Sequence, residues 1–288
     1  MSPTAGELEV LRAGALTTVQ DLGRPGLAHL GVPRSGALDP NALRLANRLV
    51  GNPETVGGLE ITLTGCTLRL SHAAAVAVTG AEAEVRVDER PGDVGRPLSV
   101  PAGAVLRIGP ARRGVRNWLA VSGGIDVPPV LGSRATDTLS GLGPSPLNDG
   151  DRLPLGVPVG PPAPVDLTVA PPPGEELRLT VRLGPRDDWF TPTALDRLLG
   201  TAYTVSPVSN RVGARLAGAA LPRAITGELP SEGIVLGAVQ VPADGQPLIF
   251  LADHPTTGGY PIIGVVADVT PLAQARPGTT VRFHGPQR

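Results

Sequence analysis

Turn-forming residues interrupt this chain so often that long regular elements are excluded. Of the 288 residues, 38 are glycine and 33 are proline, about a quarter of the chain. That share approaches the level at which a non-repeating sequence becomes disordered. Disorder also needs low hydrophobicity and high net charge, whereas 41% of the residues are hydrophobic and the formal net charge is −1. The sequence therefore predicts a folded, all-β protein of short strands joined by turns.

Short runs rich in aliphatic and β-branched residues recur along the chain, and turn residues bound several of them, as in a β-barrel or sandwich. The predicted strands are Ala83–Val87, Ala104–Ile108, Asn117–Val121, Leu177–Leu183, Gly233–Val241, Pro247–Ala252 and Tyr260–Ala267. Three other segments have an N-cap oxygen, then Pro, and end at Gly or Pro, which predicts short helices. They are Asn41–Val50, Thr193–Leu199 and Leu272–Arg276. In the first, Leu43, Ala46, Leu49 and Val50 share one face.

A proline-rich stretch divides the chain into two halves. Residues 156–174 show neither helical nor alternating hydrophobicity and predict a stiff, extended connector. We place a first β domain at 1–160, including an N-terminal loop and a helix, the connector at 161–175, and a second β domain at 176–288. Each half of the chain ends with a turn followed by a strand, and this recurrence indicates two related β domains.

The basic residues exclude several functions. All 25 are arginine, so the chain has no lysine to carry biotin, lipoate or pyridoxal phosphate, and no P-loop or Schiff-base lysine. The chain is nearly neutral and has no run of basic residues, so it lacks the positively charged surface that a nucleic-acid-binding protein needs. Uncharged apolar runs fall far short of the roughly 20 residues that span a membrane. Because residues 1–14 do not resemble a signal peptide, we expect a cytoplasmic protein.

Cysteine and histidine usage predicts no metal site. The single cysteine, Cys66, cannot form an intrachain disulfide or a thiolate cluster, and its apolar strand-like surroundings predict a buried structural thiol. The four histidines are nowhere at helical ligand spacing, so a His-Glu-x-x-His motif is absent. They are His29, His72, His254 and His284.

Two stretches concentrate polar residues beyond the needs of a core. In residues 17–39, glycines permit close approach of a ligand, and Arg24 and Arg34 offer forks for a carboxylate or phosphate. The amides after Asp39 would also favour an anion. The alternative is an irregular loop in which Asp39 only caps the following helix.

The second polar stretch runs from residue 209 to 261. Its segment Pro242–Gly245 is typical of a hairpin turn. Asp253 next to His254 is either a base with its orienting partner, or a cap for the Thr-Thr-Gly-Gly turn that follows. Neighbouring side chains on a strand point to opposite faces, so we expect one of the two to face a site.

Eight motifs, in order over about residues 8–284, resemble one family. They are Gln20–Gly26, Gly31–Asp39, Ala120–Pro128, Leu131–Arg134, Asp187–Phe190, Ser209–Gly213, Ser231–Gly233 and Thr256–Pro261. The chain is thereby similar to the biotin-dependent carboxyltransferase family, also called allophanate hydrolase subunit 2 or KipI antagonist. The resemblance implies two cyclophilin-like β-barrel domains. Many members have Lys where this chain has Ile262, so any role of that ammonium is absent or belongs to an arginine.

The resemblance also implies function. Many bacterial members are subunits of an ATP-dependent 5-oxoprolinase, which opens the lactam of 5-oxoproline to glutamate, and this is the leading hypothesis. The implied partners are a KipI-like protein (allophanate hydrolase subunit 1) and a small lactam-utilisation subunit. ATP is the cofactor of the complex, and biotin is not attached to this chain. One alternative is the carboxyltransferase of a biotin-dependent urea or allophanate system. Another is a regulator that binds a KipI-like kinase inhibitor.

Site residues follow from both lines of reasoning. We expect Asp253 and His254 to be catalytic, through proton transfer or orientation. Asp253 is the one expected to face the site, because the family tolerates Arg in place of His254. The predicted substrate-binding residues are Arg24, His29, Arg34, Ser35, Asp39, Arg211, Gln240, Thr256, Thr257, Gly258, Gly259 and Tyr260. Among them, Arg24, Arg34 and Arg211 are predicted to bind an anion. We also expect the two polar stretches to line one cleft between the domains.

Overall fold

The computed structural model describes residues 6–164 and 174–286, and the chain divides into two compact units. The first unit is Met1–Arg24 with Ser35–Pro173, and the second is Pro25–Arg34 with Gly174–Arg288. The division at residue 173 falls inside the predicted connector. Residues 165–173 of that connector lie outside the described residues, and residues 156–164 contain no helix or strand.

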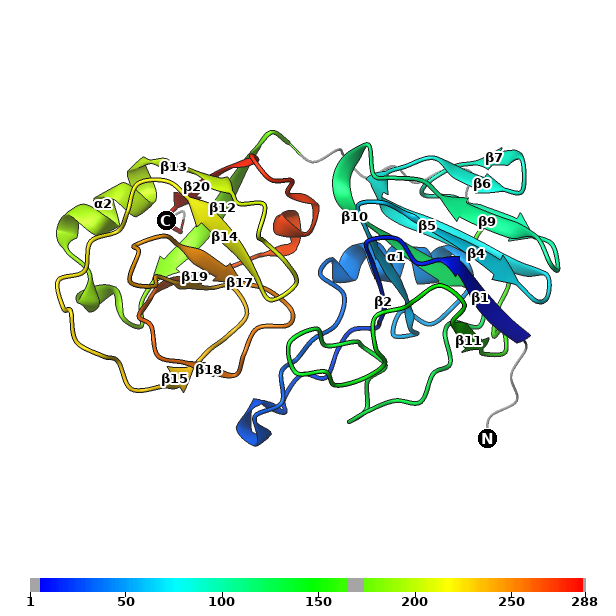
Figure 1. Ribbon diagram of the computed structural model, residues 1–288, viewed down its shortest axis with the longest axis horizontal. Coiled ribbons are helices and arrows are strands. Elements are labelled where there is room, and N and C mark those ends of the chain that lie inside the picture. The colour runs from blue at the N-terminus through cyan, green and yellow to red at the C-terminus, as the bar shows by residue number, and fades with distance from the viewer. Residues whose placement is uncertain (1–5, 165–173, 287–288) are drawn as a thin grey trace. The chain divides into compact units, whose positions relative to one another are not determined.

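Two antiparallel sheets build the first unit (Figure 1). The six-stranded sheet has the order β11 (Arg152–Leu155), β1 (Gly6–Arg12), β4 (Cys66–Leu70), β9 (Val105–Ile108), β6 (Val85–Val87) and β7 (Arg90–Gly92). The five-stranded sheet has the order β2 (Leu16–Gln20), β3 (Gly58–Thr62), β10 (Arg113–Val121), β5 (Ala74–Glu82) and β8 (Pro97–Val100). Alternate residues along the strands, such as Leu8 and Val10 on β1, are buried, as expected for sheets with one face on the core.

Side chains from both sheets form one apolar core in the first unit. Leu68 and Leu106 come from the six-stranded sheet, and Ile61 and Leu119 come from the five-stranded sheet. Cys66, on β4, is fully buried in this core, as predicted. Burial raises the pKa of its thiol to about 12, although Arg12 acts weakly in the opposite direction. The thiol is therefore a small hydrophobic group at neutral pH.

The helix α1 (Pro40–Leu49) confirms the helix predicted after Asp39. The Asp39 carboxylate accepts a hydrogen bond from Ala42 N at 3.0 Å, and Pro40 occupies the first turn. The predicted apolar face is buried, and Ala46 and Leu49 pack against residues of β5 and β10.

The second unit contains a closed seven-stranded barrel (Figure 1). Its order is β12 (Glu176–Leu183), β19 (Ile262–Val266), β16 (Ala238–Gln240), β17 (Leu248–Phe250), β14 (Gly213–Ala217), β13 (Ala202–Val205) and β20 (Thr280–His284). The pair β12 and β20 is parallel, and the other neighbours are antiparallel. A separate two-stranded sheet joins β15 (Glu232–Gly233) to β18 (Thr257–Gly258).

Helical elements of the second unit match the sequence in part. The helix α2 (Pro192–Gly200) begins where predicted, and its Thr191 cap accepts from Ala194 N at 3.2 Å. The segment expected as a helix at Leu272–Arg276 is instead the 3-10 helix η3 (Thr270–Gln274). Pro277 disfavours helical backbone at Arg276, and Ala275 is already extended, so the segment is limited to a short 3-10 helix. The remaining 3-10 helices are η1 (Ala28–Leu30) and η2 (Asp187–Trp189).

The mainly β fold class is confirmed, with two α-helices in the described ranges and a closed barrel in the second unit. The first unit distributes its strands over two sheets. None of the helices within residues 6–164 and 174–286 is long and apolar enough to cross a membrane.

Candidate functional site

The Thr-Thr-Gly-Gly turn of the second unit lies at the two-stranded sheet β15–β18, outside the barrel sheet. Thr257 and Gly259 are exposed, and Thr256 and Gly258 are half-buried. In the part of the chain that the structure describes, neither threonine hydroxyl makes a hydrogen bond to protein. Two hydroxyl groups and a glycine pair at an accessible turn are suited to binding oxygen atoms of a small polar molecule.

Gln240 and Tyr260, both predicted to bind substrate, meet at this turn. Gln240 lies on β16 with 6% of its surface exposed, and its Nε2 donates to Tyr260 O at 3.4 Å. A side chain on Gly258 would come within 2.9 Å of Gln240 Nε2 and 2.6 Å of Ile234 Cδ1. Both atoms are the ends of flexible side chains, so a larger residue at position 258 would have to displace them.

Sequence reasoning missed Arg223, which lies beside Tyr260. The Arg223 guanidinium carbon is 5.7 Å from the centre of the half-exposed Tyr260 ring, a cation–π arrangement. Its Nη2 donates to Val241 O at 2.5 Å, which holds the guanidinium in place. No motif contained Arg223, so only the fold could have identified it.

Arg211 and Asp253, for which the sequence predicted separate roles, form a buried ion pair. Arg211 Nε and Nη2 each donate to one Asp253 oxygen at 2.9 Å, and both side chains have no exposed surface. The backbones are also joined, since Asp253 N donates to Arg211 O at 3.1 Å. The carboxylate thus neutralises the guanidinium that was predicted to bind an external anion. The catalytic role predicted for Asp253 stays a prediction.

His254 differs from its neighbour. It is 6% exposed, and its Nδ1 lies 2.8 Å from Pro255 O. A neutral ring that donates from Nδ1 to this carbonyl carries its lone pair on Nε2. Its ring centre lies 6.3 Å from that of Phe250 on β17. Of the two residues predicted to be catalytic, Asp253 is held in an ion pair, whereas His254 contacts the backbone of its own segment.

In the first unit, Arg24 is also buried, with 3% of its surface exposed. Its Nη2 donates to Ala135 O at 2.6 Å and its Nε to Val130 O at 3.3 Å. The predicted open fork is therefore directed at the protein's own backbone. Nη1 is buried without a hydrogen-bond partner within the described residues, so anion binding by Arg24 is limited to this nitrogen.

The segment that Arg24 holds is also held by other residues of the first polar stretch, residues 17–39. Asp21 accepts from Ser133 Oγ and from Arg134 N, each at 2.6 Å. Gln20 Nε2 and Ser35 Oγ both donate to Thr136 O, at 3.0 and 2.9 Å. The polar residues of this stretch therefore have a structural role, because their hydrogen bonds hold the loop against residues 130–136.

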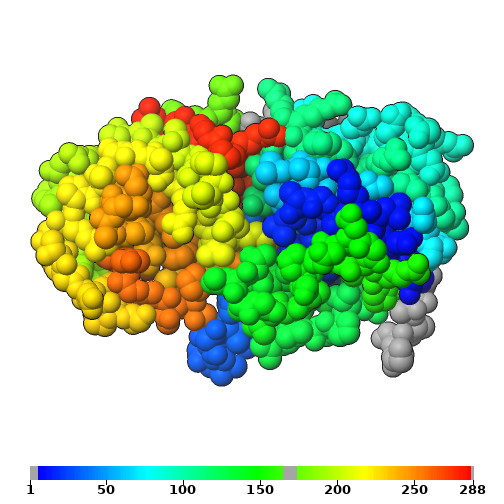
Figure 2. All heavy atoms as spheres, viewed as in Figure 1, coloured from blue at the N-terminus to red at the C-terminus, as the bar shows by residue number. Residues whose placement is uncertain are grey.

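The remaining predicted residues of the first polar stretch are more accessible. His29 belongs to the exposed 3-10 helix η1, which projects in blue at the lower edge of the view in Figure 2. Arg34 is half-buried, and the structure gives its guanidinium no carboxylate within the described ranges. Arg34 is therefore the arginine of this stretch best suited to an external anion.

The structure brings the predicted residues together in two groups. The first unit groups Arg24 and Ser35 around residues 130–136, and the second unit groups Gln240 and Tyr260 at the turn, with Arg211 paired to Asp253. The cleft expected between the two polar stretches stays a prediction. Within residues 6–164 and 174–286, no three His, Cys, Asp or Glu side chains gather as a metal site would need.

Comparison with known proteins places the chain in a family. Residues 30–285 match the family model described as carboxyltransferase domain, subdomain A and B. The chain is 41% identical over 284 residues to one subunit of the 5-oxoprolinase of Escherichia coli K12, covering 96% of this chain and 90% of that protein. The family that the motifs indicated is thereby confirmed.

Solved structures share the fold. The chain resembles the crystal structure of TTHA0988 with a TM-score of 0.88 and 37% identity, covering 98% of this chain and 56% of that one. It resembles the K. lactis urea amidolyase with a TM-score of 0.89 and 31% identity, covering the whole chain but 19% of that enzyme. The chain thus spans about half of the first structure and a fifth of the second.

Proposed function

Because the chain belongs to the carboxyltransferase domain family, we propose that it is the carboxyltransferase-like subunit of an ATP-dependent 5-oxoprolinase. This complex would open the lactam ring of 5-oxoproline to glutamate. The observation that carries the proposal is the extent of the match. Similarity to the E. coli 5-oxoprolinase subunit covers nearly the whole of both proteins, whereas most of the urea amidolyase has no counterpart in this chain.

The substrate of that reaction carries a carboxylate and a lactam carbonyl, and the chain offers partners for both. Arg34, which belongs to the second unit and has no carboxylate partner in the described ranges, would bind the carboxylate. The hydroxyls of Thr256 and Thr257 and the amides of the glycine pair would bind the carbonyl oxygen, on which negative charge develops when a nucleophile adds to the carbonyl carbon, before the ring C–N bond breaks.

Proton transfer would involve His254, with Asp253 as a positioning residue. His254 Nδ1 lies against Pro255 O, which leaves Nε2 as the atom that accepts or returns a proton. Asp253 acts at a distance from the substrate, because its two oxygens bind Arg211 and hold residues 211 and 253 in register. The Asp253–Arg211 pair would thereby set where His254 lies.

Nucleotide and biotin chemistry would come from outside this chain. Covalent biotin does not fit, since the sequence has no lysine. ATP supplies the energy for ring opening in the assembled complex, and no lysine-containing phosphate loop is present here to bind it. We therefore propose a KipI-like subunit and a small lactam-utilisation subunit as partners, in a cytoplasmic hydrolase.

One alternative is favoured by a specific observation. The family model is described as a carboxyltransferase domain, and the fold is that of a urea amidolyase region. A carboxyltransferase would accept a carboxyl group from biotin carried on another protein and pass it to urea or a related amide. The same turn would then bind the amide oxygen.

One experiment separates the two functions. The chain is purified with its two partner subunits and supplied with ATP and either 5-oxoproline or urea, with and without avidin. We expect glutamate from 5-oxoproline, unaffected by avidin, and no carboxylation of urea. Urea-dependent ATP consumption that avidin abolishes would instead establish the alternative.

A further inference from the structure

The position of the Thr256–Tyr260 turn depends on a strand that does not belong to the barrel. β18 within the turn pairs with β15, with Glu232 opposite Gly258 and Gly233 opposite Thr257. Ile234 N also donates to Thr256 O at 2.9 Å. Because β15 and β18 form their own two-stranded sheet, the contacts that fix the position of β15 also fix the position of the turn.

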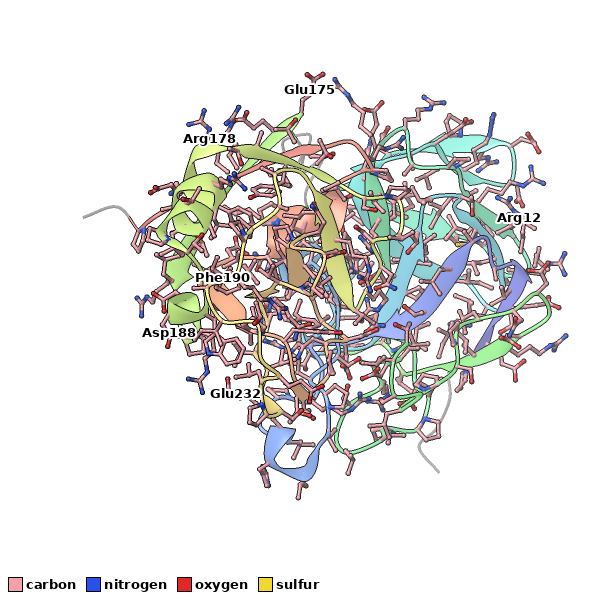
Figure 3. The ribbon with its side chains drawn as sticks, turned by 60° about the vertical axis from the view of Figure 1, so that its left-hand side comes forward. Arg12, Glu175, Arg178, Asp188, Phe190 and Glu232 are labelled. Atoms are coloured by element: carbon pink, nitrogen blue, oxygen red, sulfur yellow. The ribbon has the colours of Figure 1, made fainter. Side chains whose placement is uncertain are left out.

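An ion pair connects β15 to the barrel. Arg186 is fixed to barrel strand β19, because its backbone N donates to Ile262 O at 3.0 Å. Its side chain then reaches Glu232, where Nε donates to Oε2 at 2.9 Å and Nη2 donates to Oε1. Glu232, labelled in Figure 3, lies on β15. Barrel, Arg186, Glu232 and the turn thus form a continuous series of contacts.

The pair has the two-point geometry of an arginine–carboxylate fork, which defines direction as well as distance. Its hydrogen bonds lower the pKa of the Glu232 carboxyl and raise the pKa of the Arg186 guanidinium. Both groups are therefore charged at neutral pH. The side chains remain 37% and 29% exposed, so the pair contributes little to global stability.

A second attachment keeps β15 folded without the pair. Ile234, next to β15, is buried in an apolar cluster with Ala238, Leu248, Phe250 and Ile262. Burial in this cluster holds the segment against the barrel through the hydrophobic effect. Apolar packing does not define orientation as a fork does, so the ion pair and the cluster have different roles.

We propose that Arg186 and Glu232 are positioning residues that hold the Thr256–Tyr260 turn in its binding geometry. The proposal rests on the proposed function for the turn's role in binding the substrate. Neither residue touches the substrate. They act on the turn through β15, so that its hydroxyls and amides are already aligned when a carbonyl oxygen arrives.

The first readout needs no activity. The chain has two tyrosines: Tyr260 at the turn, and Tyr203, buried in the barrel against Phe283. In Glu232→Gln, observed by ring signals of labelled tyrosine, we expect the Tyr260 signal to shift and the Tyr203 signal to stay. Amide hydrogen exchange at residues 257–259 should also accelerate, because the sheet opens more often.

A matched control lies in the same unit. Glu176 accepts hydrogen bonds from Arg178 and Arg282, which likewise lower its carboxyl pKa, but it lies on β12. Glu176→Gln should leave Tyr260 and the exchange of residues 257–259 unchanged. The exchanged pair Arg186→Glu with Glu232→Arg should restore the wild-type Tyr260 signal at least in part.

The second readout is turnover of the assembled complex. We expect Glu232→Gln to lower kcat/KM by about tenfold to a hundredfold, as a small misplacement of binding groups does, with an unchanged unfolding midpoint. Unchanged Tyr260 signals and exchange would overturn the proposal, and so would a moved turn with full turnover. If the wild-type complex does not open 5-oxoproline, the proposed function fails, and the tyrosine and exchange readouts still decide whether the pair holds the turn.

Discussion

Arg211 in the second unit and Arg24 in the first unit are both buried, and their charges are compensated in different ways. In the second unit, Arg211 meets the Asp253 carboxylate through two hydrogen bonds of 2.9 Å. In the first unit, Arg24 donates to the backbone carbonyls of Val130 and Ala135. Carbonyl dipoles satisfy hydrogen bonds but leave the positive charge in place, whereas a carboxylate cancels it.

The difference shows which arginine has charge available for a ligand. Arg211 is already neutralised, so it stabilises the second unit and orients the segment that carries Asp253. Arg24 retains its charge and has one nitrogen without a partner within the described residues. The sequence predicts the same anion-binding role for both, and that role stays a prediction for Arg24, whereas the Arg211 guanidinium is occupied by Asp253.

The largest expected effect comes from breaking the charged pair. Asp253→Asn leaves Arg211 buried without its counter-charge, which should destabilise the second unit by about 3–5 kcal/mol. Chemical unfolding followed by tyrosine signals measures this unit, because both tyrosines lie in it.

The double variant Arg211→Met with Asp253→Leu serves as the control. It removes both charges together and should be more stable than Asp253→Asn. If Asp253→Asn costs less than about 1 kcal/mol, as an exposed pair would, the contrast between the two arginines is wrong.

The next effect is in the first unit. Arg24→Met removes donors from two backbone carbonyls, and the loss should be about 1–3 kcal/mol. Arg107→Met is the matched control, since Arg107 is exposed on β9 of the same unit and the structure gives its side chain no hydrogen bond within the described ranges. It should leave stability unchanged. Urea unfolding of both variants, followed by labelling of Cys66 in the first unit, provides the measurement. A larger loss for Arg24→Met than for Asp253→Asn would reverse the comparison.

The pH dependence of stability tests the burial of the neutral Cys66 thiol in the first unit. The folded Cys66 pKa of about 12 lies above its ordinary value of 9.0. Above pH 9 the unfolded thiol loses its proton while the folded thiol keeps it, so stability should fall as pH rises. Between the two pKa values, the Cys66 thiol should lower the free energy of unfolding by about 1.4 kcal/mol per pH unit. Wild type should lose more stability than Cys66→Ala between pH 9 and 11, and equal slopes would contradict the burial.

The smallest effect is expected at Ser35. Its hydroxyl donates to Thr136 O, but that carbonyl also accepts from Gln20 Nε2. Ser35→Ala therefore leaves no carbonyl unsatisfied and should cost no more than about 1 kcal/mol. The same unfolding experiment measures it, and a loss as large as that of Arg24→Met would show that Ser35 has a further structural role.

Local signals in the sequence predicted the local structure well. The cap at Asp39 and Pro40 marked α1, and Thr191 marked α2. The predicted strand Gly233–Val241 was too long, since β16 contains three of its residues and Gly233 pairs with the turn instead. Gly237, with a φ of +82°, ends the extended run just before β16.

Long-range pairing was beyond sequence reasoning. Arg211 and Asp253 lie 42 residues apart, and with 25 arginines and 26 acidic residues no pattern selects this pair. Their contact depends on the register between β14 and β17. Arg24, among glycines and prolines, had the sequence of an exposed loop, and its burial follows from the distant segment 130–136. Glu232 lay inside a family motif, but its partner Arg186 did not.

Reconstitution by omission tests the central claim most directly. Glutamate formed from 5-oxoproline and ATP is measured with this chain alone, with the partner subunits alone, and with all subunits together. We predict turnover only when all subunits are present. This chain contributes substrate binding and proton transfer, and its partners contribute the ATP-dependent step. Turnover by the partners without this chain, or by this chain without them, would contradict the account.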